Sequence, residues 1–207
     1  MNILEHYALT SGTDKYEHGY CPFYHKYLEH LRQSNISLLE IGVQEEHSIH
    51  MWNAYFPNAD IHGIDIRFQR RTARATYHLL NVELQEFEEY TKTCQEWDVI
   101  IDDGGHTMKQ QQLALKLLWP KVKSGGIFIM EDLHTSSEYY RKTHNPNNDI
   151  TTFELIEALR DKRESFCSTF ISNEEYAAIL NDVSTVEVWS KQPGIIADST
   201  TSVIIKA

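Results

Sequence analysis

Cysteine is scarce in this chain of 207 residues, which has only Cys21, Cys94 and Cys167. Because these cysteines are odd in number and lack the spacing of metal-binding motifs, we expect no disulfide framework and favour a reducing compartment. No apolar stretch approaches the length of a membrane-spanning helix. The N-terminal sequence MNILEHYALTSGTDK lacks the basic region and apolar core of a secretory signal. We therefore expect a cytoplasmic protein with no membrane partner.

Positively charged residues are also few. The chain has 19 lysines and arginines against 30 aspartates and glutamates, which gives a formal net charge of −11. Nucleic-acid-binding proteins usually carry a basic surface that contacts phosphates, so we expect no nucleic-acid partner. Internal repeats and low-complexity tracts are missing as well. The length and the hydrophobic content of 41% suit a single globular α/β domain, which we assign to residues 1–207.

The most informative stretch that is present is WDVIIDDGGH, residues 97–106. Its apolar run suits a strand that is buried on both faces, as in a parallel sheet. The run ends in Asp102 and Asp103, which are followed by two glycines and His106. Because ligands of open α/β sheets bind at the carboxyl ends of the strands, we expect two carboxylates and an imidazole at the ligand-binding edge.

A second apolar run, GIFIMED at residues 126–132, has the same design and ends in Glu131 and Asp132. If the two strands are neighbours, up to four carboxylates and His106 meet at one edge. Hydrated divalent cations and proton transfers both use such groups. An alternative for one aspartate is to cap a helix that begins near Thr107, but this role does not account for the whole set.

Strand and helix patterns alternate along the chain, which implies a parallel sheet with right-handed crossovers. Strands are predicted at residues 37–43, 59–66, 76–80, 97–103 and 126–132, and helices at 49–56, 84–94 and 107–122. An alternating run at 183–190 and an apolar run at 202–206 suit a closing pair of strands, one of them antiparallel. We divide the domain into an N-terminal helical and loop cap (1–35), a cofactor-binding core (36–132), a lid loop (133–148) and closing helices and strands (149–207).

The order of four motifs resembles that of class I S-adenosylmethionine (SAM) methyltransferases: LLEIGV, GIDI, DVIIDDGGH and GGIFIMEDLHT. With the GTDK…HGY and MW…YFPNA segments, the chain more narrowly resembles the metal-dependent sugar O-methyltransferases of the macrocin and mycinamicin type. The resemblance implies a Rossmann-like α/β fold. Its sheet would be mostly parallel and seven-stranded, with a C-terminal antiparallel strand.

The resemblance also implies a binding site for S-adenosyl-L-methionine. The residues it assigns to this cofactor are Glu40, Gly42, Ser48, Asp65 and Asp102. Asp65 would accept hydrogen bonds from the ribose hydroxyls. It follows Gly42 by 23 residues, which agrees with the usual position of an acidic ribose ligand, about 20 residues beyond the first turn.

The resemblance assigns Asp103, Glu131 and Asp132 to a Mg²⁺ ion and makes His106 the general base. Metal coordination stabilises the alkoxide of a hydroxyl that is otherwise a poor nucleophile, and a nearby histidine takes the proton. The implied activity is O-methylation of a hydroxyl on a small molecule, a sugar of a secondary metabolite such as an antibiotic. The implied partners are this hydroxylated or glycosylated substrate and further copies of the chain in a homo-oligomer.

Two positions depart from the family pattern. Glu46 stands where the first turn of the family has a glycine, and residues 80–83, LNVE, stand where the family often has a GDQ motif. These departures favour an alternative, a degenerate methyltransferase-like protein that binds a ligand or partner without methyl transfer. The intact DDGGH and MED motifs favour the enzyme. A third reading is a metal-dependent enzyme on the same sheet that uses another cosubstrate.

Aromatic side chains near the N-terminus and histidines of the lid loop are further candidates for substrate contacts. The tyrosines suit either an aromatic wall for a glycosylated substrate or packing of a helix. We favour packing for Tyr24 and Tyr27, and a place in the site for Tyr20, which lies in the HGY segment. His134 and His144 of the lid loop are weaker candidates for substrate binding.

Overall fold

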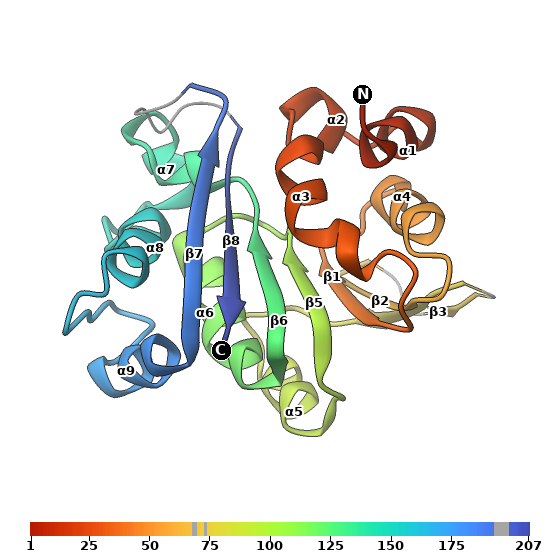
Figure 1. Ribbon diagram of the computed structural model, residues 1–207. Helices are drawn as coiled ribbons and strands as arrows, with labels where there is room; N and C mark the ends of the chain where they lie inside the picture. Colours follow the sequence, from red (N-terminus) through yellow and green to blue (C-terminus); the bar gives the residue numbers. More distant parts are fainter. Residues whose placement is uncertain (68–69, 73, 193–198) are drawn as a thin grey trace.

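A single mixed sheet forms the centre of the protein in the computed structural model, which describes residues 1–67, 70–72, 74–192 and 199–207. The strand order is β3-β4-β2-β1-β5-β6-β8-β7 (Figure 1). The strands are β1 (Ser37–Ile41), β2 (Asp60–Asp65), β3 (Arg70–Arg71), β4 (Thr76–Leu79), β5 (Trp97–Asp102), β6 (Val122–Met130), β7 (Val183–Ser190) and β8 (Thr200–Lys206). The seven longer strands confirm the predicted sheet, and the two-residue β3 is an addition to it.

Five strands at the centre of the sheet run parallel, because β1 pairs in parallel with β2 and β5, β2 with β4, and β5 with β6. The C-terminal strand β8 runs antiparallel to both of its neighbours, β6 and β7. This arrangement confirms the predicted closing pair of strands with one antiparallel member. It also places β1, β5 and β6 side by side, so that their carboxyl ends meet at one edge.

Helices cover both faces of the sheet. The α-helices are α1 (Ile3–Ser11), α2 (Lys15–His18), α3 (Cys21–Leu28), α4 (His47–Tyr55), α5 (Gln85–Thr93), α6 (Met108–Leu118), α7 (Arg141–His144), α8 (Thr152–Arg160) and α9 (Asn173–Asp182). Four short 3₁₀ helices accompany them: η1 (Glu29–Leu31), η2 (Trp119–Lys121), η3 (Leu133–Ser136) and η4 (Glu138–Tyr140). None of these helices, within the ranges described, is long and apolar enough to cross a membrane.

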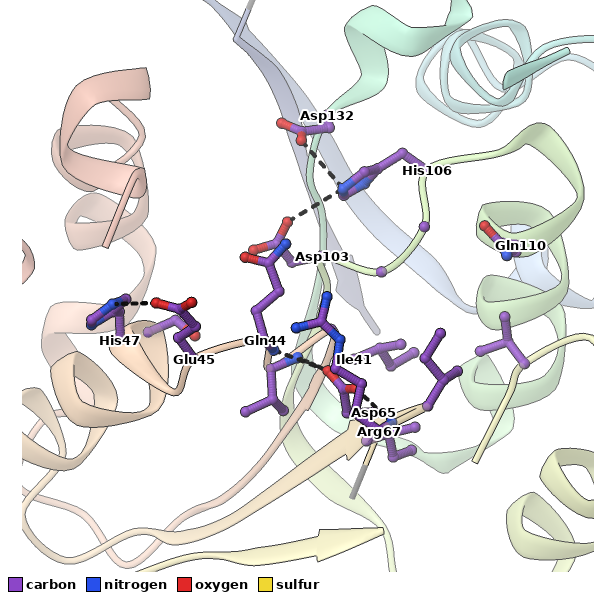
Figure 2. A pocket seen from close by; sticks show the side chains of 18 of the residues that line it. Ile41, Gln44, Glu45, His47, Asp65, Arg67, Asp103, His106, Gln110 and Asp132 are labelled. Atoms are coloured by element: carbon purple, nitrogen blue, oxygen red, sulfur yellow. Dashed lines mark hydrogen bonds and ion pairs between the residues drawn. The ribbon is translucent and has the colours of Figure 1, made fainter. Parts of the chain in front are cut away.

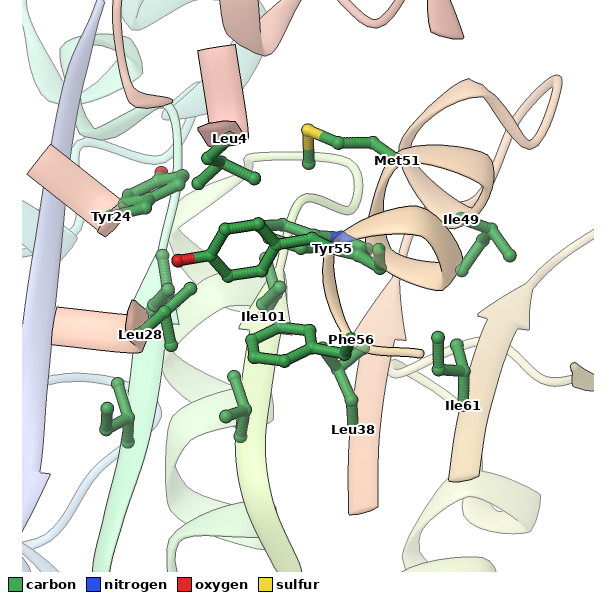
Figure 3. Close-up of a cluster of buried hydrophobic side chains, with 14 of the residues drawn as sticks. Leu4, Tyr24, Leu28, Leu38, Ile49, Met51, Tyr55, Phe56, Ile61 and Ile101 are labelled. Atoms are coloured by element: carbon green, nitrogen blue, oxygen red, sulfur yellow. The ribbon is translucent and has the colours of Figure 1, made fainter. Parts of the chain in front are cut away.

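Alternate residues of each strand supply two separate hydrophobic cores. Leu38 of β1 packs with α1, α3 and α4 on one face (Figure 3), whereas Leu39 packs with α5, α6, α8 and α9 on the other. Strands that are buried on both faces are mostly apolar, which explains the nearly continuous apolar runs in the sequence. The N-terminal helices therefore lie on the same side of the sheet as α4.

The segment that was predicted to be a lid loop, residues 133–148, contains the short helices η3, η4 and α7. Leu133, His134 and Thr135 at the start of the lid are buried. A lid function for residues 133–148 stays a prediction, and its first three residues belong to the packed part of the molecule.

Candidate functional site

A pocket of about 440 Å³ lies at the carboxyl ends of the parallel strands. This volume is within the range of small-molecule sites, about 300–1,000 Å³. Figure 2 shows Asp65 on one side of the pocket and His106 and Asp132 on the other, with Asp103 between them. The pocket therefore joins the predicted ribose ligand to the predicted metal and base residues.

Asp65 at the end of β2 is held by backbone N–H groups. Its Oδ2 accepts hydrogen bonds from Val43 N at 3.1 Å and Gln44 N at 2.9 Å, and its Oδ1 accepts one from Arg67 N at 2.9 Å. The side chain is 7% exposed and lines the pocket. Because each carboxylate oxygen accepts more than one hydrogen bond, this carboxylate keeps acceptor capacity for a ligand, and its ribose role stays a prediction.

Gly42 has a structural requirement of its own. Its φ is +85°, and a Cβ at this position would lie 1.9 Å from the carbonyl oxygen of Asp103. Only glycine accepts both the left-handed backbone and this close approach. Gly42 thus brings the turn after β1 against the turn after β5, and both turns line the pocket.

Glu46 adopts the backbone conformation that the missing glycine would favour, with a φ of 69°. In the described part of the chain, its neighbours Gln44 and Glu45 line the pocket, and Glu46 does not. Glu45 forms an ion pair of 3.4 Å with His47. The departure from the family pattern therefore places a glutamate in a strained turn, with its side chain outside the pocket.

A buried lysine, which the sequence reasoning did not assign, organises the acidic edge. Lys15 of α2 is 0% exposed, and its Nζ lies 2.5 Å from Asp103 Oδ2, 3.0 Å from Glu131 Oε1 and 3.5 Å from Glu40 Oε1. Burial alone would lower the pKa of Lys15, but the three carboxylates outweigh burial and raise it well above its ordinary value. Lys15 belongs to the GTDK segment. A buried lysine needs acidic partners, but the sequence alone does not show that Lys15 is buried.

Glu40 and Asp102 were predicted to contact the cofactor, and among the described residues neither lines the pocket. Glu40 is 0% exposed and accepts hydrogen bonds from Ser48 Oγ at 2.8 Å and Trp52 Nε1 at 3.3 Å, besides its contact with Lys15. Its charge inside the strand is therefore satisfied within the protein. Ser48, which was also predicted, does line the pocket.

Asp102 is buried behind the pocket, and its Oδ1 accepts a hydrogen bond of 3.2 Å from Gly104 N. Burial raises the pKa of Asp102 to about 7, against the smaller lowering effect of the Gly104 N–H. Neither Asp102 nor Asp103 caps the helix that follows. Thr107 is the N-cap of α6 and forms a capping box with Gln110, so the alternative role for one aspartate is wrong.

Three side chains from the ends of β5 and β6 form an acidic corner, which we define as Asp103, His106 and Asp132. Their potential ligand atoms all lie within 4.8 Å of one another. His106 Nε2 is 3.4 Å from Asp132 Oδ2 and 3.8 Å from Asp103 Oδ1. Glu131 was predicted as the third metal ligand, but it lies outside this group, is 2% exposed and contacts Lys15.

The backbone holds His106 in the corner. Its φ is 58°, and its carbonyl oxygen accepts a hydrogen bond of 2.9 Å from Thr135 Oγ1. The same hydroxyl lies 2.8 Å from the carbonyl oxygen of Asp132 and shares its one hydrogen between the two carbonyls, so one threonine contacts both turns. Within the described chain, the buried Nδ1 of His106 has no hydrogen-bond partner.

The charges of the corner suit a divalent cation. Burial raises the pKa of Asp103, although Lys15 and His106 oppose that effect. Burial would also raise the pKa of Asp132, but His106 and His134 outweigh it and lower this pKa. Lys15 is shared by three carboxyl groups, and burial raises the pKa of each of them, so one lysine cannot offset their full negative charge. Carboxylates and an imidazole are common ligands of divalent metals.

Tyr20 contacts the acidic corner from the interior of the protein. It is 0% exposed, and its hydroxyl donates a hydrogen bond of 2.9 Å to Asp132 Oδ1. Burial and the charge of Asp132 raise the pKa of Tyr20, so the hydroxyl remains a donor. A place for Tyr20 in the site stays a prediction, which its contact with Asp132 supports. Tyr20, Tyr24 and Tyr27 are all buried, which agrees with packing, whereas Tyr16 is partly exposed.

No family model matches the chain. The relatives that it does match among known proteins are named as O-methyltransferases. The chain is 29% identical over 141 residues to the 8-demethyl-8-(2-methoxy-alpha-L-rhamnosyl)-tetracenomycin-C 3'-O-methyltransferase of Streptomyces olivaceus, which covers 62% of this chain and 36% of that protein. It is 28% identical over 176 residues to the L-olivosyl-oleandolide 3-O-methyltransferase of Streptomyces antibioticus. This match covers 76% of this chain and 45% of that protein. The chain thus spans less than half the length of either relative.

A solved structure shares the fold. The MycE methyltransferase from the mycinamycin biosynthetic pathway, in complex with Mg and SAH, has a TM-score of 0.77 at 19% identity, over 99% of this chain and 55% of that chain. The class I methyltransferase fold that the motifs predicted is confirmed. The narrower resemblance to sugar O-methyltransferases of the macrocin and mycinamicin type is confirmed as well, because the chain also matches the mycinamicin VI 2''-O-methyltransferase of Micromonospora griseorubida and the demethylmacrocin O-methyltransferase of Streptomyces fradiae.

Proposed function

We propose that this chain takes part in the O-methylation of a hydroxyl on a small molecule, with S-adenosylmethionine as methyl donor and a divalent metal, and that the acceptor is a sugar of a secondary metabolite. The proposal is carried by one continuous pocket, which is lined by Asp65 and by the three residues of the acidic corner. Methyl transfer needs the donor and the acceptor in line, and one continuous pocket provides for both. Self-association and a cytoplasmic location stay predictions.

The donor lies at the Asp65 end in this proposal. Asp65 offers its carboxylate to the ribose hydroxyls, and Gly42 and Ser48 lie along the wall for the methionine part. Apolar side chains of Ile66, Leu80 and Val82 line the same end of the pocket, and they suit the flat adenine ring. Leu80 and Val82 belong to the segment that replaces the GDQ motif, so this segment still supplies pocket surface.

The metal lies at the acidic corner. Asp103 and Asp132 would hold it, together with either Glu131, as the sequence predicted, or His106, which lies nearer to both aspartates. Once bound, the cation would lower the pKa of the acceptor hydroxyl. Mg²⁺ prefers carboxylate oxygens and water, which favours the set with Glu131. The MycE structure, whose fold this chain shares, was solved with Mg.

His106 is the general base in this proposal. The imidazole takes the proton of the acceptor hydroxyl, and Asp103 and Asp132 stabilise the imidazolium that results. Its Nε2 lies toward the two aspartates of the corner, whereas Nδ1 is buried, so Nε2 is the nitrogen that would take the proton. S-adenosylmethionine supplies an electrophilic methyl group through its sulfonium, and the protein supplies alignment and the base.

The first prediction separates the two roles of His106. A general base contributes about 10²–10⁴-fold to the rate, so His106→Ala should lower kcat by about that factor. Methyl transfer is read as release of S-adenosylhomocysteine with a panel of hydroxylated glycosides as acceptors. The control is calorimetric titration of Mn²⁺ without any donor or acceptor. Unchanged Mn²⁺ affinity supports the base, lost affinity makes His106 a ligand, and full activity contradicts both roles.

A degenerate protein without methyl transfer is the second candidate, and the substituted turn at Glu46 favours it. Calorimetric titration of S-adenosylhomocysteine, with and without Mg²⁺, separates the two candidates. Micromolar binding supports the donor end of the proposal. No binding in either condition favours the degenerate protein or a metal-dependent enzyme with another cosubstrate.

A further inference from the structure

We infer that Tyr20 is a positioning residue that fixes the carboxylate of Asp132 and thereby sets the affinity of the acidic corner for a divalent cation. The inference rests on the proposed function only in taking a divalent cation as the ligand. It concerns a buried side chain that lies 112 residues from its partner in the sequence.

The two aspartates of the corner are arranged alike. Each has one oxygen bound to a buried side chain of the N-terminal cap and turns its other oxygen toward His106. For Asp132, Oδ1 accepts from the Tyr20 hydroxyl at 2.9 Å and Oδ2 is 3.4 Å from His106 Nε2. For Asp103, Oδ2 contacts Lys15 at 2.5 Å and Oδ1 is 3.8 Å from His106 Nε2. The free oxygens therefore converge because the other oxygens are held.

The Tyr20 hydroxyl is itself held in place. The side chain is fully buried, its ring stacks on His18 with a centroid distance of 5.2 Å, and an edge contact with Trp189 lies at 5.8 Å. The hydroxyl also lies 3.4 Å from the carbonyl oxygen of Thr200. A donor that is fixed on several sides orients its acceptor, as partners behind metal ligands generally do.

Tyr24 provides a matched control. It is also 0% exposed and lies on α3, of which Tyr20 is the N-cap residue, but its hydroxyl pairs with Thr201 Oγ1 at 2.7 Å and not with a residue of the corner. Tyr24→Phe removes the same atom from the same core. Any general effect of losing a buried hydroxyl should therefore be similar in the two variants.

The experiment is titration of Mn²⁺ alone into the full chain and into Tyr20→Phe and Tyr24→Phe, followed by electron paramagnetic resonance or calorimetry. Loss of an outer partner of a metal ligand typically costs about 10–100-fold in metal affinity. We expect Tyr20→Phe to weaken Mn²⁺ binding by at least about 10-fold and Tyr24→Phe to leave it unchanged, while both variants lose similar thermal stability.

Each outcome decides a different question. Equal Mn²⁺ affinity in Tyr20→Phe and Tyr24→Phe, with the unchanged chain binding the metal, would overturn the positioning role and leave the proposed metal site standing. If the unchanged chain binds no Mn²⁺, the proposed metal site and this inference both fail. Because neither donor nor acceptor is present, a failure to find the acceptor does not affect the result.

Discussion

Lysine–aspartate pairs lie at both ends of β5. They differ in burial and in the number of carboxylates that contact the lysine. At the amino end, Lys123 Nζ is 2.7 Å from Asp98 Oδ2, with side chains 40% and 25% exposed. At the carboxyl end, Lys15 Nζ is 2.5 Å from Asp103 Oδ2, and the lysine is 0% exposed. The amino-end pair is completed by Ser37, whose N and Oγ donate to the same Asp98 oxygen at 2.7 Å and 2.9 Å.

The two pairs differ in how far their charges are balanced. At the amino end the charge of one lysine balances that of one aspartate, and a serine completes the hydrogen bonds. Because this pair is partly exposed, it contributes about 0–1 kcal/mol to the free energy of unfolding. At the carboxyl end Lys15 faces Asp103, Glu40 and Glu131, and burial raises the pKa of all three carboxyls. Three buried anions around one lysine are expensive to maintain, and a bound cation would lower that cost, which is consistent with the proposed metal site at this end.

The largest difference is expected from removing the two aspartates in turn. Asp103→Asn removes a proposed metal ligand and should weaken Mn²⁺ binding by more than about 100-fold, beyond the range for outer partners. Asp98→Asn should leave Mn²⁺ affinity within about 2-fold, because this residue lies at the other end of the strand. Calorimetric titration of Mn²⁺ measures both. Similar losses in the two variants would contradict a metal site at the carboxyl end.

The next difference concerns the two lysines. In the presence of a chelator, Lys15→Met leaves buried carboxylates without their cation and should lower the free energy of unfolding by about 3–5 kcal/mol. Lys123→Met should cost at most about 1 kcal/mol. Urea denaturation checks both values. Added Mn²⁺ should then restore more stability to Lys15→Met than to Lys123→Met, and equal recovery would show that no cation replaces Lys15.

The smallest effect is the pH dependence of the amino-end pair. Burial would raise the pKa of Asp98, but hydrogen bonds from Lys123 and Ser37 outweigh it and hold this pKa below its ordinary value of 3.8. The unfolded chain therefore binds the proton more readily, so the pair stabilises the fold above about pH 4 and loses this contribution as the pH falls through the folded pKa. Urea denaturation should show wild type and Asp98→Asn converging in stability as the pH falls below about 4. A constant gap would contradict this account.

Much of the fold follows from local patterns in the sequence. The apolar runs of β1, β5 and β6 predict strands that are buried on both faces, and the alternation with helices predicts their parallel order. The charged residues directly after those runs must then lie at one edge. For this reason Asp103, His106 and Asp132 could be placed at the site from the sequence, and Asp65 could be placed there from the family resemblance and its spacing from Gly42. All four line the pocket.

The sequence by itself determined the strands, their common direction and the edge at which charged side chains gather, because hydrophobic periodicity and strand ends are local properties. Only the tertiary structure decided which oxygens face the pocket. Lys15 reaches Asp103 across 88 residues of sequence, and Tyr20 reaches Asp132 across 112. It also placed Glu40 and Asp102 behind the pocket and Glu131 against Lys15. These outcomes depend on how the N-terminal cap packs on the sheet, and pairwise contacts between distant segments leave no periodic signal in the chain.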